Sequence, residues 1–273
     1  MSNTMVLASA EEAWRGQYLA RVANYTYHLH STASDLGGLH GRLQQLGLTL
    51  HVHVGNPFYD VPSGHHGYVA ATEEDIVIAI RGSGEADDWR NNLRMAQQAH
   101  WRGGRVHGGF ALAARGITLA IQNVLGSKPE LYGQKSLWLT GHSSGGSVAI
   151  LAAEELAAAG IHVAGIYTYG APKVGDAVYA HSYALRTQIH AFSALGDFVP
   201  LLPPAWLVRN GRGLNIQNYV HVVPPKLLVG KTVSMRAALR CLMDKRLSLL
   251  ERVVGALIEF SPHSLNAYIT NLK

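Results

Sequence analysis

The apolar positions of the chain alternate between spacing typical of strands and spacing typical of helices. Strand-like runs lie at Leu48–Val54, Tyr68–Ala71, Asp75–Ile80, Ser136–Thr140, Ile161–Tyr169 and Gln188–Leu195. Between or before them, helical spacing is found at 10–30, Phe110–Val124 and 147–159. This alternation predicts a mostly parallel sheet with helices on both faces. The run 75–80 is almost continuously apolar, as is typical of a strand buried on both faces.

Glycines mark some of the predicted boundaries. Gly37 and Gly38 predict a turn after the first helix. Gly160 predicts the end of the helix 147–159, because glycine adopts the left-handed conformation of a helix C-terminus at low cost. No repeat or low-complexity linker interrupts the pattern. We therefore expect a single α/β domain over residues 1–273.

Composition and charge narrow the class of protein. With 273 residues, 48% of them apolar and 15% charged, the chain is not disordered, collagen-like or a coiled coil. The single Cys241 excludes an intramolecular disulfide and cysteine-rich metal modules. Most of the net charge of +5 lies in 226–259, and the rest of the chain has no basic face, so we expect no nucleic-acid partner.

A G-x-S-x-G sequence, Gly141–Gly145, joins the strand 136–140 to the Ala-rich helix that follows. Such a turn exposes a serine above the sheet, and it needs small flanking residues because the backbone turns sharply against its neighbours. The helix N-terminus behind the serine also favours negative charge. We predict that Ser143 is a nucleophile; the alternative is a Gly-Ser turn that only connects strand and helix.

A serine hydroxyl requires a base, and the base requires an acid that orients it. In α/β-hydrolases both follow the serine, the acid before the histidine. For the acid we favour Asp197, which follows the strand 188–195, because Asp176 is better placed to cap the next helix. For the base we favour His263, which lies in a loop before the last helix. The other downstream candidates are His181 on a predicted helix, His190 within a strand, and His221.

The oxyanion of an acyl transfer needs two backbone N–H donors. One comes from the residue after the nucleophile, here Ser144, and the other from a loop that follows an earlier strand. Residues 80–84 directly follow the buried strand 75–80, and Ser83 is the candidate donor in that loop.

Taken together, these segments resemble the class 3 lipases, the family that includes the fungal triacylglycerol lipases and feruloyl esterases. The segments that carry the resemblance, in the family's order, are Ile80–Ser83, Asp88-Trp89, Asn92-Leu93, Val106–Phe110, Gly141–Gly146, Tyr167–Gly175, Asp197–Pro200, Leu202–Pro204 and His263-Ser264. The resemblance implies an α/β-hydrolase fold, a triad of Ser143, Asp197 and His263, and an oxyanion hole formed by Ser83 and Ser144. It also implies a lipase or esterase that hydrolyses esters or acylglycerols through an acyl-enzyme and needs no cofactor. The family usually has a bulky apolar residue where this chain has Ser144, which makes the pocket wall more polar.

Two segments are candidates for contact with a lipid surface. The family's lid corresponds to 84–105, which is polar here and has only a narrow apolar stripe, so soluble esters are also expected substrates. Residues 233–258 carry apolar side chains at helical spacing, and 226–259 holds seven Lys or Arg against three Asp or Glu. We expect a helical insert at about 226–260 that packs on the core; the alternative is a basic amphipathic flap that docks on anionic lipid.

Other functions share some of these features. A phospholipase or thioesterase would have the same triad, and a catalytically silent hydrolase-like binding protein would have the same fold. The paired histidines His28/His30, His51/His53 and His65-His66 have no carboxylate or Cys at a matching spacing, so we expect no metal site. The sequence decides neither the acyl chain length nor the oligomeric state.

Targeting signals give an expectation for the compartment. No window reaches the ~18 apolar residues of a transmembrane helix. The first 14 residues contain neither the basic leader nor the apolar core of a signal peptide. The cysteine pairs of the fungal members are also absent. We therefore expect a cytoplasmic protein or one secreted without a leader.

Overall fold

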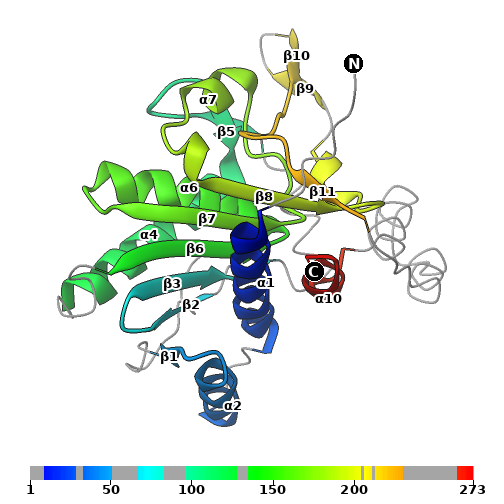
Figure 1. Ribbon diagram of the computed structural model, residues 1–273. Helices are drawn as coiled ribbons and strands as arrows, with labels where there is room; N and C mark the ends of the chain where they lie inside the picture. Colours follow the sequence, from blue (N-terminus) through cyan, green and yellow to red (C-terminus); the bar gives the residue numbers. More distant parts are fainter. Residues whose placement is uncertain are drawn as a thin grey trace.

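The computed structural model describes residues 9–28, 33–50, 67–82, 96–127, 135–203, 206–210, 213–229 and 263–272. Within these ranges a seven-stranded sheet has the order β1-β2-β3-β6-β7-β8-β11 (Figure 1). Its strands are β1 (Thr49–Leu50), β2 (Gly67–Ala71), β3 (Asp75–Ile80), β6 (Ser136–His142), β7 (Val163–Tyr169), β8 (Ile189–Ala194) and β11 (Lys226–Leu228).

Within this sheet, β3, β6, β7, β8 and β11 run parallel to one another, and β1 and β2 form an antiparallel edge. The predicted mostly parallel sheet is therefore confirmed. In register, Ile80 of β3 lies beside Gly141 of β6, which lies beside Thr168 of β7. The carboxyl ends of these three strands thus meet at one edge of the sheet, where α/β proteins place their ligands.

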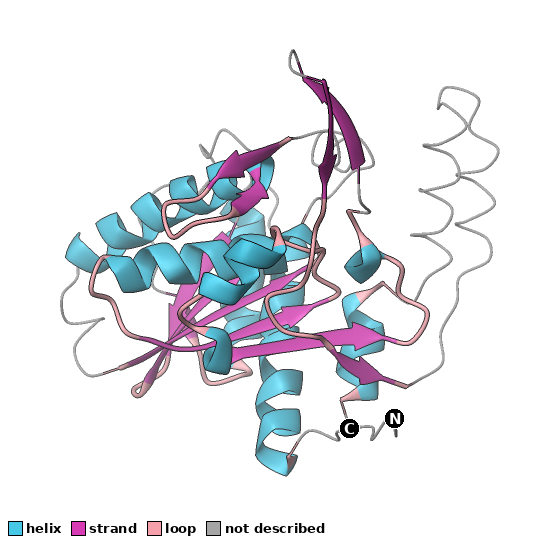
Figure 2. Ribbon diagram, turned by 90° about the horizontal axis from the view of Figure 1, so that it is seen from above, coloured by secondary structure: helices cyan, strands magenta, loops and turns pink. Residues whose placement is uncertain are grey.

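Helices cover both faces of the sheet, α1 and α10 on one side and α4 and α6 on the other (Figures 1 and 2). The helical segments are α1 (Ala10–Tyr25), η1 (Thr26–His28), α2 (Ala33–Gln44), α4 (Gly108–Ser127), α6 (Ser144–Ala158), α7 (Ala177–Ser182), η2 (Arg186–Gln188), η3 (Val199–Leu201) and α10 (Leu265–Asn271). Helix α10 packs against α1, so the two ends of the described chain share one face. In the described ranges no helix has both the length and the apolar character needed to cross a bilayer.

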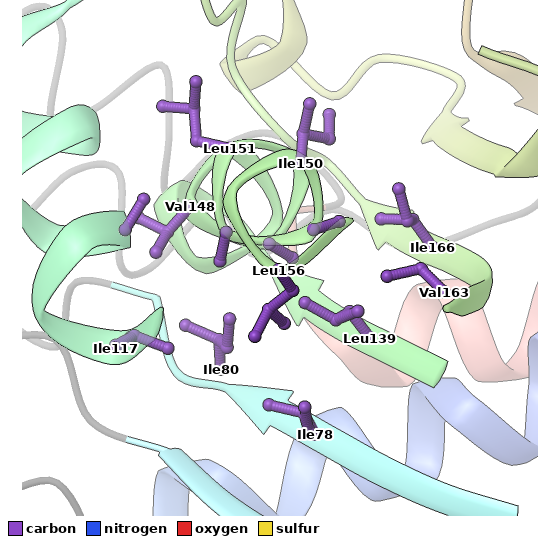
Figure 3. Packing of buried hydrophobic residues seen from close by; sticks show 14 of the residues in the cluster. Ile78, Ile80, Ile117, Leu139, Val148, Ile150, Leu151, Leu156, Val163 and Ile166 are labelled. Carbon is purple, nitrogen blue, oxygen red and sulfur yellow. The ribbon is translucent and has the colours of Figure 1, made fainter. Parts of the chain in front are cut away.

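Strand β3 shows how the sequence pattern divides the core into two layers. Successive side chains of a strand point to opposite faces. Ile76, Ile78 and Ile80 accordingly join the cluster that contains α4 and α6, while Val77 and Ala79 join the cluster that contains α1. Figure 3 shows the first cluster around α6. A strand that is apolar at each position from Ile76 to Ile80 is required here, because both faces are covered.

Two hairpins lie outside the main sheet. The first pairs β4 (Gln97–Ala99) with β5 (Arg105–His107) and occupies the last part of the expected lid segment 84–105; residues 83–95 lie outside the described ranges. The second pairs β9 (Trp206–Asn210) with β10 (Gly213–Gln217) and projects away from the sheet in Figure 2.

The predicted turn at Gly37 and Gly38 is wrong, because both residues lie inside α2. Glycine costs about 1 kcal/mol in a helix interior relative to alanine. The burial of Leu39 and Leu43, which are four residues apart on the inner face, outweighs that cost. Tertiary packing thus overrides the local propensity.

The predicted end of the helix at Gly160 is confirmed. Gly160 has φ = 83°, its N–H donates to Ala157 O, and the N–H of Ile161 donates to Leu156 O. These two bonds form the Schellman motif of a helix C-terminus.

The expected helical insert at about 226–260 begins differently from the prediction. Residues 226–228 form β11, the parallel edge strand beside β8. Residues 230–262 lie outside the described ranges, so the rest of that prediction stays a prediction.

The two-layered core predicts a large difference between two leucine truncations. Leu139 of β6 is fully buried, whereas Leu119 of α4 is 55% exposed. We expect Leu139→Ala to lower the free energy of unfolding by about 2–5 kcal/mol, because it leaves a cavity. Leu119→Ala, the control, should change it by less than about 0.5 kcal/mol. Urea denaturation of both variants measures this, and equal losses would contradict the layer assignment.

Candidate active site

Ser143 occupies the sharp turn between β6 and α6. Its backbone has φ = 56° and ψ = −138°, and it is the one non-glycine residue with positive φ in the described part of the chain. Such a conformation is costly for a residue with a Cβ and is found where the surrounding structure enforces it. Here the Ser143 N–H donates to Tyr169 O at 2.9 Å, which ties the turn to the end of β7. This is the geometry of a nucleophile elbow.

The glycines around Ser143 allow the elbow to form. A Cβ on Gly141 would lie 2.4 Å from Gly145 O, and a Cβ on Gly145 would lie 2.4 Å from Ile80 O. A Cβ on Gly146 would lie 2.8 Å from the Ala171 Cβ. The predicted requirement for small flanking residues therefore has a direct cause: at these positions the elbow touches the backbone of β3, the backbone of the turn itself and the side chain of Ala171.

Asp197 and His263 form a buried hydrogen-bonded pair. Asp197 follows β8, His263 lies directly before α10, and the two are 6% and 9% exposed. His263 Nδ1 donates to Asp197 Oδ2 at 2.8 Å. The Tyr268 hydroxyl of α10 donates to the same oxygen, and the Val199 N–H donates to Oδ1 at 2.9 Å. The carboxylate therefore accepts hydrogen bonds on both oxygens and fixes the tautomer of His263.

These partners keep Asp197 ionised. Burial raises the pKa of the carboxyl group, but the attraction of His263 and the hydrogen bonds from His263, Tyr268 and Val199 lower it by more. The pKa of Asp197 consequently lies below its ordinary value of 3.8. An ionised carboxylate is what holds an imidazole in one orientation and stabilises it once it is protonated.

The elbow and the Asp197–His263 pair lie at the same end of the sheet. Gly170 follows Tyr169, whose carbonyl accepts from Ser143, and a Cβ on Gly170 would lie 2.7 Å from Asp197 Oδ2 and 2.8 Å from His263 Nδ1. Ser143 Oγ is buried and makes no hydrogen bond to any part of the chain that the structure describes. Nucleophile–base hydrogen bonds are often long in structures without substrate. The structure thus brings the three candidate residues to one place.

The candidate oxyanion donors are only partly described. Ser144 is the first residue of α6 and is 1% exposed, so its backbone lies at the helix N-terminus beside Ser143. Ser83 lies outside the described ranges. The preceding residue, Gly82, is described, and a Cβ on it would lie 2.9 Å from Ser143 Cβ. The loop after β3 therefore does reach the nucleophile.

The alternative acid and bases have other partners. Asp176 caps α7, because its Oδ1 accepts from the Tyr179 N–H at 2.8 Å. His181 is exposed on α7, and His190 of β8 bonds to Glu12 at 2.7 Å. His221 Nε2 donates to Pro200 O at 2.7 Å. None of the four contacts the Ser143 elbow in the described structure.

Two side chains, those of His221 and Lys173, donate hydrogen bonds to the segment that follows Asp197. His221 bonds Pro200, and Lys173 Nζ donates to Leu201 O at 2.8 Å. Both acceptors belong to η3, which begins two residues after Asp197. Burial lowers the pKa of both donors, and it is opposed at His221 by the hydrogen bond to Pro200. His221, one of the alternative candidates for the base, therefore supports the loop that follows Asp197.

Sequence reasoning missed three residues of the site. Tyr268 lies five positions after His263, on the helix turn that reaches back to Asp197. His142 and Tyr27 bond to each other and His142 also bonds to His263. His142 lies inside the G-x-S-x-G sequence, but nothing in that pattern specifies a partner. Tyr27 is more than a hundred residues away from the elbow, and only the fold brings it there.

The described residues contain no group of three or more His, Cys, Asp or Glu that could hold a metal ion. Of the paired histidines, His30, His51, His53, His65 and His66 lie outside the described ranges.

The order of the parallel strands and the sharp turn between β6 and α6 are those of the α/β-hydrolase fold. Residues 77–206 match the model of the family described as Lipase (class 3). The resemblance predicted from the motifs is thereby confirmed for this segment of the chain. Among solved structures, the chain is similar to the Lip2 lipase from Yarrowia lipolytica, with a TM-score of 0.65 and 19% identity, over 86% of this chain and 84% of that one. At this identity the likeness supports the fold.

Curated relatives give a closer similarity in sequence. The secreted mono- and diacylglycerol lipase 1 of Fusarium solani is 32% identical over 147 residues, which cover 52% of this chain and 44% of the relative. The secreted mono- and diacylglycerol lipase A of Penicillium cyclopium is 30% identical over 169 residues, which cover 58% of this chain and 50% of the relative. The chain thus spans about half the length of the curated relatives it matches.

The expectation of a cytoplasmic protein is contradicted by these relatives, which are named as secreted. The expectation gave too much weight to the lone cysteine. A chain of 273 residues buries enough apolar surface to be stable without a disulfide, so the absence of cysteine pairs does not indicate a reducing compartment.

The low pKa of Asp197 predicts how acid affects stability. Because the folded pKa lies below the unfolded one, the ionised carboxylate stabilises the folded state above pH 3.8 and loses this effect as the pH falls through the folded pKa. We expect the difference in unfolding free energy between wild type and Asp197→Asn to shrink as the pH falls from about 5 to about 2.5. Urea denaturation at each pH measures it. A difference that stays constant would contradict the lowered pKa.

Proposed function

We propose that the protein is a carboxylic ester hydrolase of the lipase and esterase type, with Ser143 as nucleophile, His263 as general base and Asp197 as the acid that orients it. The observation that carries the proposal is the buried Asp197–His263 hydrogen bond beside the strained Ser143 elbow. The class 3 lipase segment at 77–206 supports it, because that segment contains both Ser143 and Asp197.

The geometry supports a two-step acyl transfer. Ser143 Oγ attacks the ester carbonyl while His263 Nε2 removes its proton, and the oxyanion accepts hydrogen bonds from the amides of Ser144 and Ser83. His263 then returns the proton to the leaving alcohol, and Asp197 stabilises the imidazolium in between. Water enters by the same route and releases the acid. Every proton moves through His263, so this route requires no cofactor.

The names of the two relatives, which are both mono- and diacylglycerol lipases, support acylglycerols as the substrates. Their secreted location supports an extracellular place of action. A phospholipase or thioesterase is the alternative within the same triad chemistry, and a silent binding protein is the alternative outside it. We also retain the proposal that residues 1–273 form one α/β-hydrolase domain with an insert after β11.

A fluorophosphonate probe tests the proposed chemistry. The wild type should be labelled and should hydrolyse p-nitrophenyl esters, because an activated serine attacks both. Ser143→Ala should not be labelled, and its kcat should fall by about 10⁶-fold. His263→Ala should lose a similar factor, because serine and base act as one unit.

The matched control is Ser182→Ala, which removes a serine hydroxyl that bonds to Tyr179 O on α7. It should be labelled like the wild type. A well-folded wild type without labelling would favour the silent binding protein.

Contact with a lipid surface is proposed for 84–105 or 233–258, because acylglycerols are poorly soluble and collect at interfaces. The basic residues of the second segment favour anionic lipid. We expect a variant with Arg236, Arg240, Lys245 and Arg246 changed to Glu to bind anionic liposomes more weakly than the wild type. Cosedimentation measures this, with neutral liposomes as the control. If the variant and the wild type bind equally to anionic liposomes, residues 233–258 are excluded as the lipid contact.

A further inference from the structure

His142 directly precedes Ser143, and both nitrogens of its ring make hydrogen bonds. Nε2 lies 2.6 Å from the backbone carbonyl oxygen of His263, and Nδ1 lies 2.7 Å from the hydroxyl oxygen of Tyr27. A carbonyl oxygen only accepts, so Nε2 carries the proton and Nδ1 accepts from the Tyr27 hydroxyl. Burial and the neighbouring His263 lower the pKa of His142 to about 3. The ring is therefore neutral and held in one tautomer.

The Tyr27 hydroxyl also contacts the loop that follows β3. The backbone of Gly82 lies against it, because a Cβ on Gly82 would lie 2.6 Å from Tyr27 Oη. Gly82 immediately precedes Ser83, the candidate oxyanion donor. One phenol thus joins the backbone of this loop to the ring of His142.

The contacts of His142 with His263 complement those of Asp197. Asp197 bonds the His263 ring, whereas His142 bonds the His263 backbone. The two imidazole rings also pack together, with centroids 4.5 Å apart and an interplanar angle of 32°. Because His263 is held by its ring on one side and by its backbone on the other, its imidazole has little freedom to tilt away from Ser143.

We propose that Tyr27 and His142 are positioning residues for the ester hydrolysis proposed above, and that they link the loop after β3 to the backbone of His263. We call this chain of contacts, which runs from Gly82 through Tyr27 and His142 to His263, the Tyr27–His142 link. Neither side chain exchanges a proton with the substrate. The link sets the distance between the base and the oxyanion loop, and a misplacement of about 1 Å in such a site costs on the order of 100-fold in rate. The inference rests on the proposed function.

Two amide substitutions separate the link from simple packing. The side-chain nitrogen of Gln can occupy the place of His142 Nε2 and donate to the His263 carbonyl. Asn is too short to reach it and can only replace Nδ1. Each substitution therefore keeps one of the two bonds of His142 and breaks the other, whereas independent packing effects would add up when Tyr27→Phe is combined with either of them.

The experiment measures kcat and KM for a p-nitrophenyl ester, the rate of fluorophosphonate labelling, and the melting temperature. We expect Tyr27→Phe and His142→Asn to lower kcat and the labelling rate by about 10- to 100-fold, with KM within about twofold. His142→Gln keeps the bond to His263 but leaves the Tyr27 hydroxyl without its acceptor, so it should lose about as much as Tyr27→Phe, and adding Tyr27→Phe to it should cost nothing further. The double variant Tyr27→Phe/His142→Asn should be no slower than His142→Asn alone, because both break one chain.

The control is Tyr18→Phe on α1, which removes a hydroxyl that donates to Leu46 O at 3.3 Å, away from the site. It should leave kcat unchanged. The proposal is overturned if Tyr27→Phe reacts within about twofold of the wild type, or if the double variant is slower than His142→Asn by the full factor that Tyr27→Phe costs alone. If a His142 variant does not fold, the Tyr27→Phe rate decides alone. Absence of labelling in the wild type would instead overturn the proposed function itself.

Discussion

The hydrogen bond between His263 and Asp197 is the interaction on which the site depends, because it joins two segments that are 66 residues apart in sequence. The carboxylate is buried, and a buried charge is stable only when it is paired and hydrogen-bonded. Asp197 meets this condition through His263, Tyr268 and Val199. The same contacts that stabilise the charge also determine which nitrogen of His263 faces away from it. Stability and the proposed chemistry therefore have the same origin.

The parallel sheet brings the parts of the site together. Strands β3, β6, β7 and β8 end at one edge, and each contributes the residues that follow it: Gly82, Ser143, Gly170 and Asp197. Because β6 lies between β3 and β7, its elbow touches the backbone on both sides. Helices α1 and α10, which pack on one another, then bring Tyr27 and His263 to the same edge from the two ends of the described chain.

The sequence allowed prediction of the parts of this arrangement that depend on local pattern. The almost continuously apolar run of β3, the Schellman end of α6 and the serine between glycines follow from periodicity, backbone conformation and close packing. The turn predicted at Gly37 failed because burial of neighbouring leucines decided the local structure. Tyr27 and Tyr268 carry no local signal, since their hydroxyls are functional only through partners that the tertiary fold supplies. The expectation for the compartment failed because cysteine content does not determine it.

The central claim, that Asp197 orients His263 beside Ser143, is tested most directly by proton NMR of the imidazole Nδ1–H. A proton held between an imidazole and an ionised carboxylate resonates far downfield of ordinary ring protons. One such signal is expected in the wild type; it should be absent in His263→Ala and shifted upfield in Asp197→Asn. A well-folded wild type that shows no downfield signal assignable to His263 would contradict it.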